Sequence, residues 1–159
     1  MLVTHTIPPV FNASSKVLVL GSIPSPASRA QGFFYGHPQN RFWQVLSAVL
    51  GEPLPQTVEQ KREMLLRRGI ALWDVLYSCE IEGASDATIK NPVPNDFSRI
   101  FEAAKIRKVF TTGKRAYALY TELTGGEAVC LPSTSPANRA VGIPQLIEAY
   151  SMIAEALSD

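Results

Sequence analysis

Residues 16–21 read Lys16-Val17-Leu18-Val19-Leu20-Gly21, a short and continuous apolar run that closes on a glycine. Such a run is typical of a strand that is buried on both faces, as in a parallel sheet. Similar runs occupy residues 108–113 and 128–132, and helix-like segments separate them along the chain. Residues 69–76 could be a further strand or an irregular apolar segment. This alternation predicts a three-layer α/β/α sandwich around a short, mainly parallel, four-stranded central sheet.

Helical spacing and capping signals mark the segments between these runs. They predict helices over residues 40–50, 57–68, 95–104, 114–123 and 144–157. Thr57 is a suitable N-cap for the second helix because Gln60 follows three residues later, and Gly69 is suited to end it. Residues 78–95 are rich in Gly, Ser, Asp, Asn and Pro, so they form the longest predicted loop.

Length and charge set the broad class of the protein. A chain of 159 residues is expected to fold as one domain, residues 1–159. The net charge of +1 does not argue for a nucleic-acid partner, although a local basic face would suffice to bind one. No apolar run approaches membrane-spanning length, and the N-terminus lacks the pattern of a signal peptide. We therefore expect a cytoplasmic monomer with no membrane partner.

The small number of cysteines and histidines limits cofactor chemistry. The chain has two of each: Cys79, Cys130, His5 and His37. Two thiolates cannot supply the four ligands of an ordinary iron–sulfur cluster, and the histidines are too few to make a structural zinc site probable. We therefore expect no cofactor, no metal, and two buried free thiols in a reducing cytosol.

Polar segments follow the first and the last predicted strand. Residues 21–25 read Gly-Ser-Ile-Pro-Ser, and residues 132–139 read Pro-Ser-Thr-Ser-Pro-Ala-Asn-Arg. Residues 33–43 continue the first segment with five aromatics, a His, an Asn and an Arg, a mixture suited to a heterocycle pocket. Because open parallel sheets bind ligands at the carboxyl ends of their strands, these segments are predicted to converge on one cleft.

Several side chains in these segments allow both a structural and a functional interpretation. Phe42 and Trp43 have helical spacing and are expected in the core. Asn40 could be a helix N-cap, or an amide that positions a water molecule or a base. His37 could hold its loop or contact a ligand directly. Residues 133–139 could be a Ser/Thr-rich turn or a loop that grips phosphates.

Two charged residues are interpreted mainly as structural. Asp74 follows Trp73 in an apolar segment, so we expect it to be buried with a partner. Structural hydrogen bonding is the first interpretation of Asp74, and a general-base role is the second. Arg41 is interpreted as a solvated or ion-paired residue rather than a catalytic one.

Taken together, four blocks resemble the uracil-DNA glycosylase superfamily: residues 21–25, 34–43, 113–117 and 131–139. The His-Pro-x-Asn-Arg-Phe-Trp block is similar to the mismatch-specific uracil/thymine glycosylase branch. The Leu-Pro-Ser-Thr-Ser-Pro-Ala-Asn block is most similar to the hypoxanthine-DNA glycosylase branch. Ile23 departs from much of the superfamily, which has an Asp or Asn there to activate or position the attacking water. In the hypoxanthine branch the second block supplies this group, and Asn40 is the matching position.

The resemblance implies a monofunctional DNA repair glycosylase that acts on double-stranded DNA containing a deaminated base. It would flip the nucleotide out of the duplex, hydrolyse the N-glycosidic bond of deoxyinosine, release hypoxanthine and leave an abasic site. No lysine matches a Schiff-base nucleophile, so no lyase step is implied. The alternatives are a mismatch-specific uracil/thymine-DNA glycosylase and, because of Ile23, a non-catalytic nucleic-acid-binding module of the same fold.

The resemblance also assigns roles to residues. Asn40 would be the catalytic residue that positions water, and the ring of Tyr35 would stack on the flipped base. The expected substrate-binding residues are Ser22, Ile23, Pro24, Ser25, Tyr35 and His37. The expected DNA-binding residues are Ser133, Thr134, Ser135, Pro136, Ala137, Asn138 and Arg139. Among these, Ser133 and Ser135 would pinch the DNA backbone, and residues 136–138 would enter the duplex.

Overall fold

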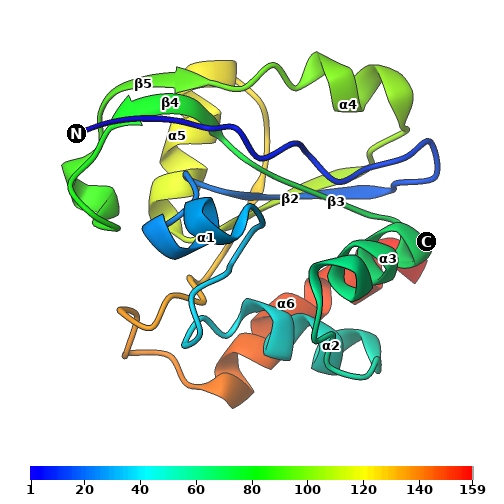
Figure 1. The fold of residues 1–159 in the computed structure, drawn as a ribbon. Coiled ribbons are helices and arrows are strands. Elements are labelled where there is room, and N and C mark those ends of the chain that lie inside the picture. The colour runs from blue at the N-terminus through cyan, green and yellow to red at the C-terminus, as the bar shows by residue number, and fades with distance from the viewer. Residues whose placement is uncertain (159) are drawn as a thin grey trace.

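A parallel sheet of four strands forms the centre of the computed structural model, which describes residues 1–158 (Figure 1). Its strand order is β3 (Ile70–Asp74), β2 (Val17–Gly21), β6 (Lys108–Thr112) and β7 (Val129–Leu131). All three strand pairs are parallel. The predicted four-stranded parallel sheet is confirmed, and residues 70–74 form a regular strand.

Helices cover both faces of this sheet, which gives the expected layers (Figure 1). One outer layer contains α2 (Phe42–Leu50), α3 (Val58–Arg68) and α6 (Ile143–Ser158). The other contains α4 (Ser98–Ala103) and α5 (Lys114–Thr124), together with a second sheet. A short helix, α1 (Pro26–Gln31), follows β2 and was not predicted. Because both faces are covered, every residue of β2 and β3 is buried.

The second sheet corrects the prediction that residues 78–95 form a long loop. It is antiparallel, in the order β1 (Leu2–Thr4), β4 (Leu76–Glu80) and β5 (Lys90–Pro94), and a 3-10 turn, η1 (Asp86–Thr88), lies between β4 and β5. Two register irregularities interrupt the β4–β5 pairing. A strand with bulges and prolines at a sheet edge has no clear alternation in sequence, which is why its composition indicated a loop.

Local signals placed the helices well but missed some of their ends. Thr57 and Gln60 form the predicted capping box of α3, and Gly69 ends that helix at φ 77°. The helices α2 and α4 begin two to three residues later than predicted, at Phe42 and Ser98. Such shifts are common because helix ends fray and their terminal turns are often irregular.

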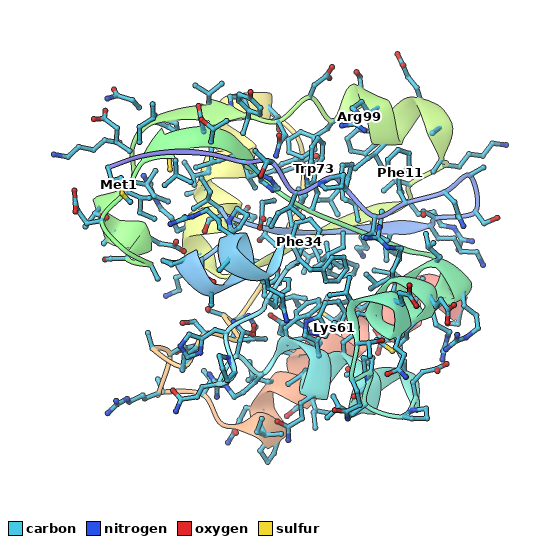
Figure 2. All side chains as sticks on the ribbon, in the orientation of Figure 1. Met1, Phe11, Phe34, Lys61, Trp73 and Arg99 are labelled. Atoms are coloured by element: carbon cyan, nitrogen blue, oxygen red, sulfur yellow. The ribbon has the colours of Figure 1, made fainter. Side chains whose placement is uncertain are left out.

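The core lies between the layers, where Figure 2 shows Phe34 and Trp73 in the interior. Phe42 and Trp43 are buried as expected. Both cysteines are free, but only Cys79 is buried; Cys130 is exposed because β7 is an edge strand. The expectation of two buried thiols is therefore wrong for Cys130. Across residues 1–158, none of the helices has the length and apolar character needed to cross a membrane.

Candidate active site

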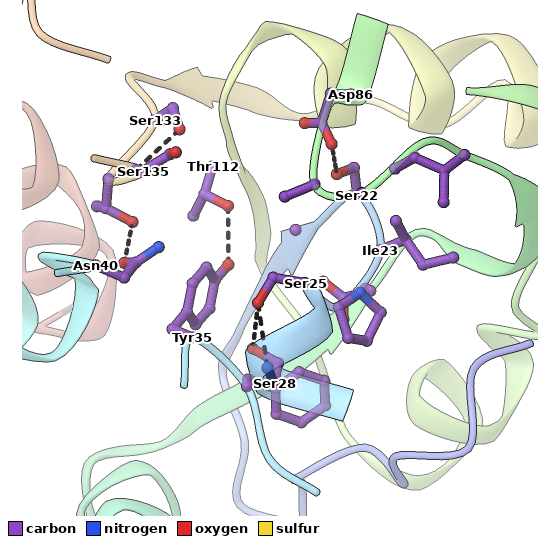
Figure 3. Close-up of a pocket in the computed structure, with 18 residues that line it drawn as sticks. Ser22, Ile23, Ser25, Ser28, Tyr35, Asn40, Asp86, Thr112, Ser133 and Ser135 are labelled. Atoms are coloured by element: carbon purple, nitrogen blue, oxygen red, sulfur yellow. Dashed lines mark hydrogen bonds between the residues drawn. The ribbon is translucent and has the colours of Figure 1, made fainter. Parts of the chain in front are cut away.

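A pocket opens at the carboxyl ends of the parallel strands (Figure 3). Its lining comes from residues 21–28 after β2, residues 34–40 before α2, residues 81–86 after β4, and residues 133–135 after β7. The last residues of β3 and β6, Asp74 and Thr112, complete it. The predicted convergence of the segments after the first and last strands with the aromatic segment is confirmed.

Nine of the candidate residues line this pocket, and five do not. The lining includes Ser22, Ile23, Pro24, Ser25, Tyr35, Asn40, Ser133, Thr134 and Ser135. The remaining five are His37, Pro136, Ala137, Asn138 and Arg139, which lie outside the lining. His37 is exposed, and its Nδ1 accepts a hydrogen bond from the Gln39 backbone N–H at 3.0 Å. Its position therefore supports the loop-holding interpretation rather than contact with a base.

Asn40 is held in one orientation by two hydrogen bonds to the same oxygen. Its Oδ1 accepts from the Phe42 backbone N–H at 2.9 Å and from the Thr134 hydroxyl at 2.8 Å. These donors use both lone pairs of the amide oxygen. The amide nitrogen, Nδ2, points toward Tyr35 and the interior of the pocket (Figure 3). Arg41, not Asn40, is the N-cap of α2, but the Asn40 amide oxygen accepts from the first N–H of that helix. The amide nitrogen faces the pocket, and the role of Asn40 in positioning water stays a prediction.

Arg41 joins the Asn40 segment to the loop after β7. Its guanidinium donates to the backbone carbonyls of Val141 at 2.6 Å and of Ser135 and Asn138 at 2.9 Å, with a longer contact of 3.4 Å to Thr134. Its backbone N–H donates to the Thr134 carbonyl as well. The interpretation of Arg41 as an ion-paired or solvated residue is therefore wrong: it is half-buried and organises the loop that carries the candidate DNA-binding residues.

The loop after β7 is a turn stabilised by its own side chains. The Ser133 hydroxyl accepts from the Ser135 N–H, and the Ser135 hydroxyl accepts from the Ala137 N–H. Asn138 Nδ2 donates to the Ser133 carbonyl at 2.9 Å. Each serine hydroxyl that acts as an acceptor keeps its own proton for an outside acceptor. The Ser/Thr-turn interpretation is therefore correct, and it is compatible with phosphate contacts.

Tyr35 spans the pocket between α2 and β6. Its ring stacks on Phe42 with a centroid distance of 3.9 Å and an interplanar angle of 13°. Its hydroxyl lies 2.8 Å from Thr112 Oγ1. Burial raises the pKa of Tyr35 well above its ordinary value, and the Asp74 carboxylate raises it further, so the phenol stays neutral. Since Phe42 covers one ring face, only the opposite face is available to stack on a base.

Asp86 is a pocket residue that the sequence did not single out. Its carboxylate accepts a hydrogen bond from the Ser22 hydroxyl at 2.9 Å (Figure 3). The residue as a whole is exposed, but desolvation of the carboxyl group raises its pKa, and nearby Asp74 raises it further, while Ser22 opposes the shift. Asp86 enters the site because the pairing of β4 with β5 folds its turn over the end of β2. Thr112, also missed, ends a strand and could have been found from the carboxyl-end rule.

Gly21 is required by the close approach of Asp74. The two residues are paired in register at the ends of β2 and β3. A Cβ atom on residue 21 would lie 2.4 Å from Asp74 Oδ1 and 3.1 Å from the Tyr35 hydroxyl. The φ angle of Gly21 is not positive, so a side chain would not be strained by the backbone at this position. Glycine is needed here because it leaves space for these two side chains.

We expect Gly21→Ala to displace the Asp74 carboxylate and to destabilise the fold by about 1–3 kcal/mol, the usual cost of overpacking. Thermal unfolding measures the stability, and the base release that the sequence resemblance implies measures the site. Gly126→Ala is the matched control, because its new Cβ would crowd the buried Tyr120 ring at 2.8 Å, outside the pocket lining, so it should lose stability without a separate effect on the site. A Gly21→Ala protein with wild-type stability and activity would contradict the crowding argument.

Comparisons with known proteins identify the class that this fold and pocket define. The model of the uracil DNA glycosylase superfamily matches residues 8–153. A solution NMR structure from Methanosarcina acetivorans, described as a candidate uracil DNA glycosylase, has a TM-score of 0.82 and 31% sequence identity over the full length of both chains. The chain belongs to the uracil DNA glycosylase superfamily, and its class is that of the DNA repair glycosylases.

Two curated relatives are named more specifically. A protein of Methanosarcina barkeri, named hypoxanthine DNA glycosylase, is 38% identical over 136 residues, which is 83% of this chain and 86% of the relative. A protein of Methanosarcina acetivorans with the same name is 34% identical over 142 residues, 87% of this chain and 90% of the relative. The resemblance inferred from the sequence blocks is confirmed.

Proposed function

We propose that the protein hydrolyses the N-glycosidic bond of deoxyinosine in double-stranded DNA, releasing hypoxanthine and leaving an abasic site. The names of the two relatives support this substrate. The target nucleotide would be flipped out of the duplex, because its glycosidic bond cannot be reached within the base stack. The observation that carries the mechanism is the Asn40 amide, fixed through its oxygen and turned with its nitrogen toward the pocket.

In this proposal Asn40 binds the attacking water through Nδ2. The N–H would donate to the water oxygen and hold it near C1′ while the bond from C1′ to the base breaks. An amide cannot take up the water proton, so that proton passes to the departing base or to solvent. Catalysis would then rest mainly on positioning and on stabilising the charge that develops on the leaving base. Ile23 is consistent with assigning the water to Asn40, because Ile23 lines the pocket but its apolar side chain cannot bind water.

The other candidate residues have binding roles in the proposal. The free face of Tyr35 would stack on the base, and the segment from Ser22 to Ser25 would contact its edge. Ser133 and Ser135 would donate to DNA phosphates, which fixes register without reading sequence. The exposed residues Ala137 and Arg139 lie beyond the pocket on the same loop, where they would contact the duplex.

A base-release panel tests the substrate. Duplexes containing deoxyinosine, deoxyuridine or a G·T mismatch are incubated with the enzyme, and free bases are quantified. We expect hypoxanthine release to be the fastest. Efficient uracil or thymine release without hypoxanthine release would instead assign the enzyme to the mismatch-specific activity. No release from any duplex, with retained DNA binding, would favour the binding-module alternative.

A further inference from the structure

A buried His5–Asp74 pair lies beside the pocket and has no part in the mechanism above. His5 Nε2 lies 3.2 Å from Asp74 Oδ2, and the two side chains are only 1% and 6% exposed. The His5 ring is enclosed by the edges of Phe34 and Trp73, with centroid distances of 6.0 and 6.2 Å. Asp74 itself lines the pocket. Burying two ionisable side chains is costly unless each has a partner, which makes this pair a candidate for a role beyond packing.

The backbone determines which His5 nitrogen carries the proton. His5 Nδ1 accepts a hydrogen bond from the Ile7 backbone N–H at 3.1 Å. A neutral His5 ring must therefore carry its proton on Nε2, the nitrogen that faces Asp74. Neither His5 Nε2 nor Asp74 Oδ2 makes an aligned hydrogen bond within residues 1–158, so each depends on this one close contact.

The other carboxylate oxygen of Asp74 is turned toward Gly21 and the pocket. A Cβ atom added to Gly21 would lie only 2.4 Å from this oxygen, Oδ1, so Oδ1 lies directly against Gly21. Asp74 is also fixed through its backbone, because Asn95 Nδ2 donates to its carbonyl at 2.9 Å. Burial raises the pKa of the Tyr35 hydroxyl and of the Asp86 carboxyl, and the nearby Asp74 carboxylate raises both further. Asp74 Oδ1 is thus a preorganised hydrogen-bond acceptor, and it lies where the strand ends close the pocket.

We propose that Asp74 Oδ1 accepts the ring N–H that deamination creates on the base, and that His5 positions this carboxylate through Oδ2. Deamination of adenine to hypoxanthine converts ring nitrogen N1 from an acceptor into an N–H donor. A carboxylate attracts the donor and repels the lone pair of adenine N1. Guanine shares this N–H, so Asp74 would separate hypoxanthine from adenine and not from guanine. The inference rests on the proposed function, since it concerns the base that occupies the pocket.

Asp74→Asn tests the inference because His5 dictates how the new amide lies. The His5 Nε2–H would attract the amide oxygen, which leaves an NH₂ donor facing the pocket. Affinities are measured for duplexes carrying uncleavable 2′-fluoro-arabino forms of inosine and of unsubstituted purine, whose N1 is an acceptor. We expect Asp74→Asn to weaken inosine binding about 10- to 100-fold and to leave purine binding unchanged or tighter. Equal weakening of both, or no change in either, would overturn the proposal.

Two controls separate this test from folding defects and from the proposed function. Asp96→Asn makes the same chemical change at an exposed residue outside the pocket lining, and we expect wild-type affinities. Hypoxanthine release by the wild-type enzyme tests the proposed function independently of the affinity ratio. If hypoxanthine is released but the wild type binds inosine and purine duplexes equally, the proposed function stands and the role of Asp74 is rejected.

A matched pair of His5 variants tests the positioning role. His5→Gln can still reach Asp74 with an N–H donor but loses the acceptor for Ile7. His5→Asn keeps an acceptor near Ile7 but is too short to reach Asp74. We expect His5→Gln to retain the inosine-over-purine preference and His5→Asn to lose it. If both variants lose the preference equally while remaining folded, His5 is structural and does not position the carboxylate.

Discussion

Replacement of Asn40 by alanine is expected to lower hypoxanthine release about 10²–10³-fold, the usual cost of removing one preorganised donor that acts in the transition state. The affinity for DNA should change little, because the loop that carries Ser133 and Ser135 is held by Arg41 and by its own hydrogen bonds. Single-turnover base release and duplex affinity, measured on the same protein, distinguish the two effects.

Two further variants show whether the orientation of the Asn40 amide matters. Thr134→Val removes one of the two donors to Oδ1 and keeps the shape of the side chain, so we expect an intermediate loss of base release. Gln39→Ala removes an exposed neighbouring amide that is absent from the pocket lining, and it should behave as wild type. Asn40→Ala with undiminished base release would reject the assignment of Asn40.

Replacement of Arg41 by alanine should have the second large effect, and it should appear in both stability and activity. The guanidinium holds the carbonyls of Val141, Ser135 and Asn138 together. Hydrogen bonds from a charged donor contribute about 1.5–3 kcal/mol each and are not additive, so we expect a loss of about 2–4 kcal/mol in the free energy of unfolding. Base release should fall more than tenfold because Thr134 would no longer hold Asn40.

Denaturant unfolding and single-turnover assays measure these two losses. Arg41→Lys keeps the charge but lacks the planar fork, so it should recover only part of the stability. Arg139→Ala removes the same charge from an exposed position on the same loop. It should leave stability unchanged and weaken DNA binding with a smaller salt dependence. Wild-type stability and activity in Arg41→Ala would show that the loop keeps its shape without this arginine.

The main features of the fold follow from local patterns in the chain. Continuous apolar runs that end in glycine mark strands buried on both faces, and the spacing of Thr57 and Gln60 marks the start of α3. These signals are reliable because each depends on neighbouring residues alone. The strands of the second sheet carry no such signal, since β1, β4 and β5 are stabilised by pairing with one another.

The candidate site, like the fold, could be predicted from the sequence only in part. The sequence by itself determined that the segments after the first and last strands meet, because parallel strands all end at one edge of the sheet. It also singled out Asn40, Tyr35 and the serine-rich loop. Only the tertiary structure decided how these groups are oriented. The Thr134 hydroxyl that donates to Asn40 Oδ1, the carbonyls around Arg41, and the buried contact of His5 with Asp74 join segments distant in sequence. Side-chain orientation depends on such long-range partners, and a periodic pattern reports only which face of an element is buried.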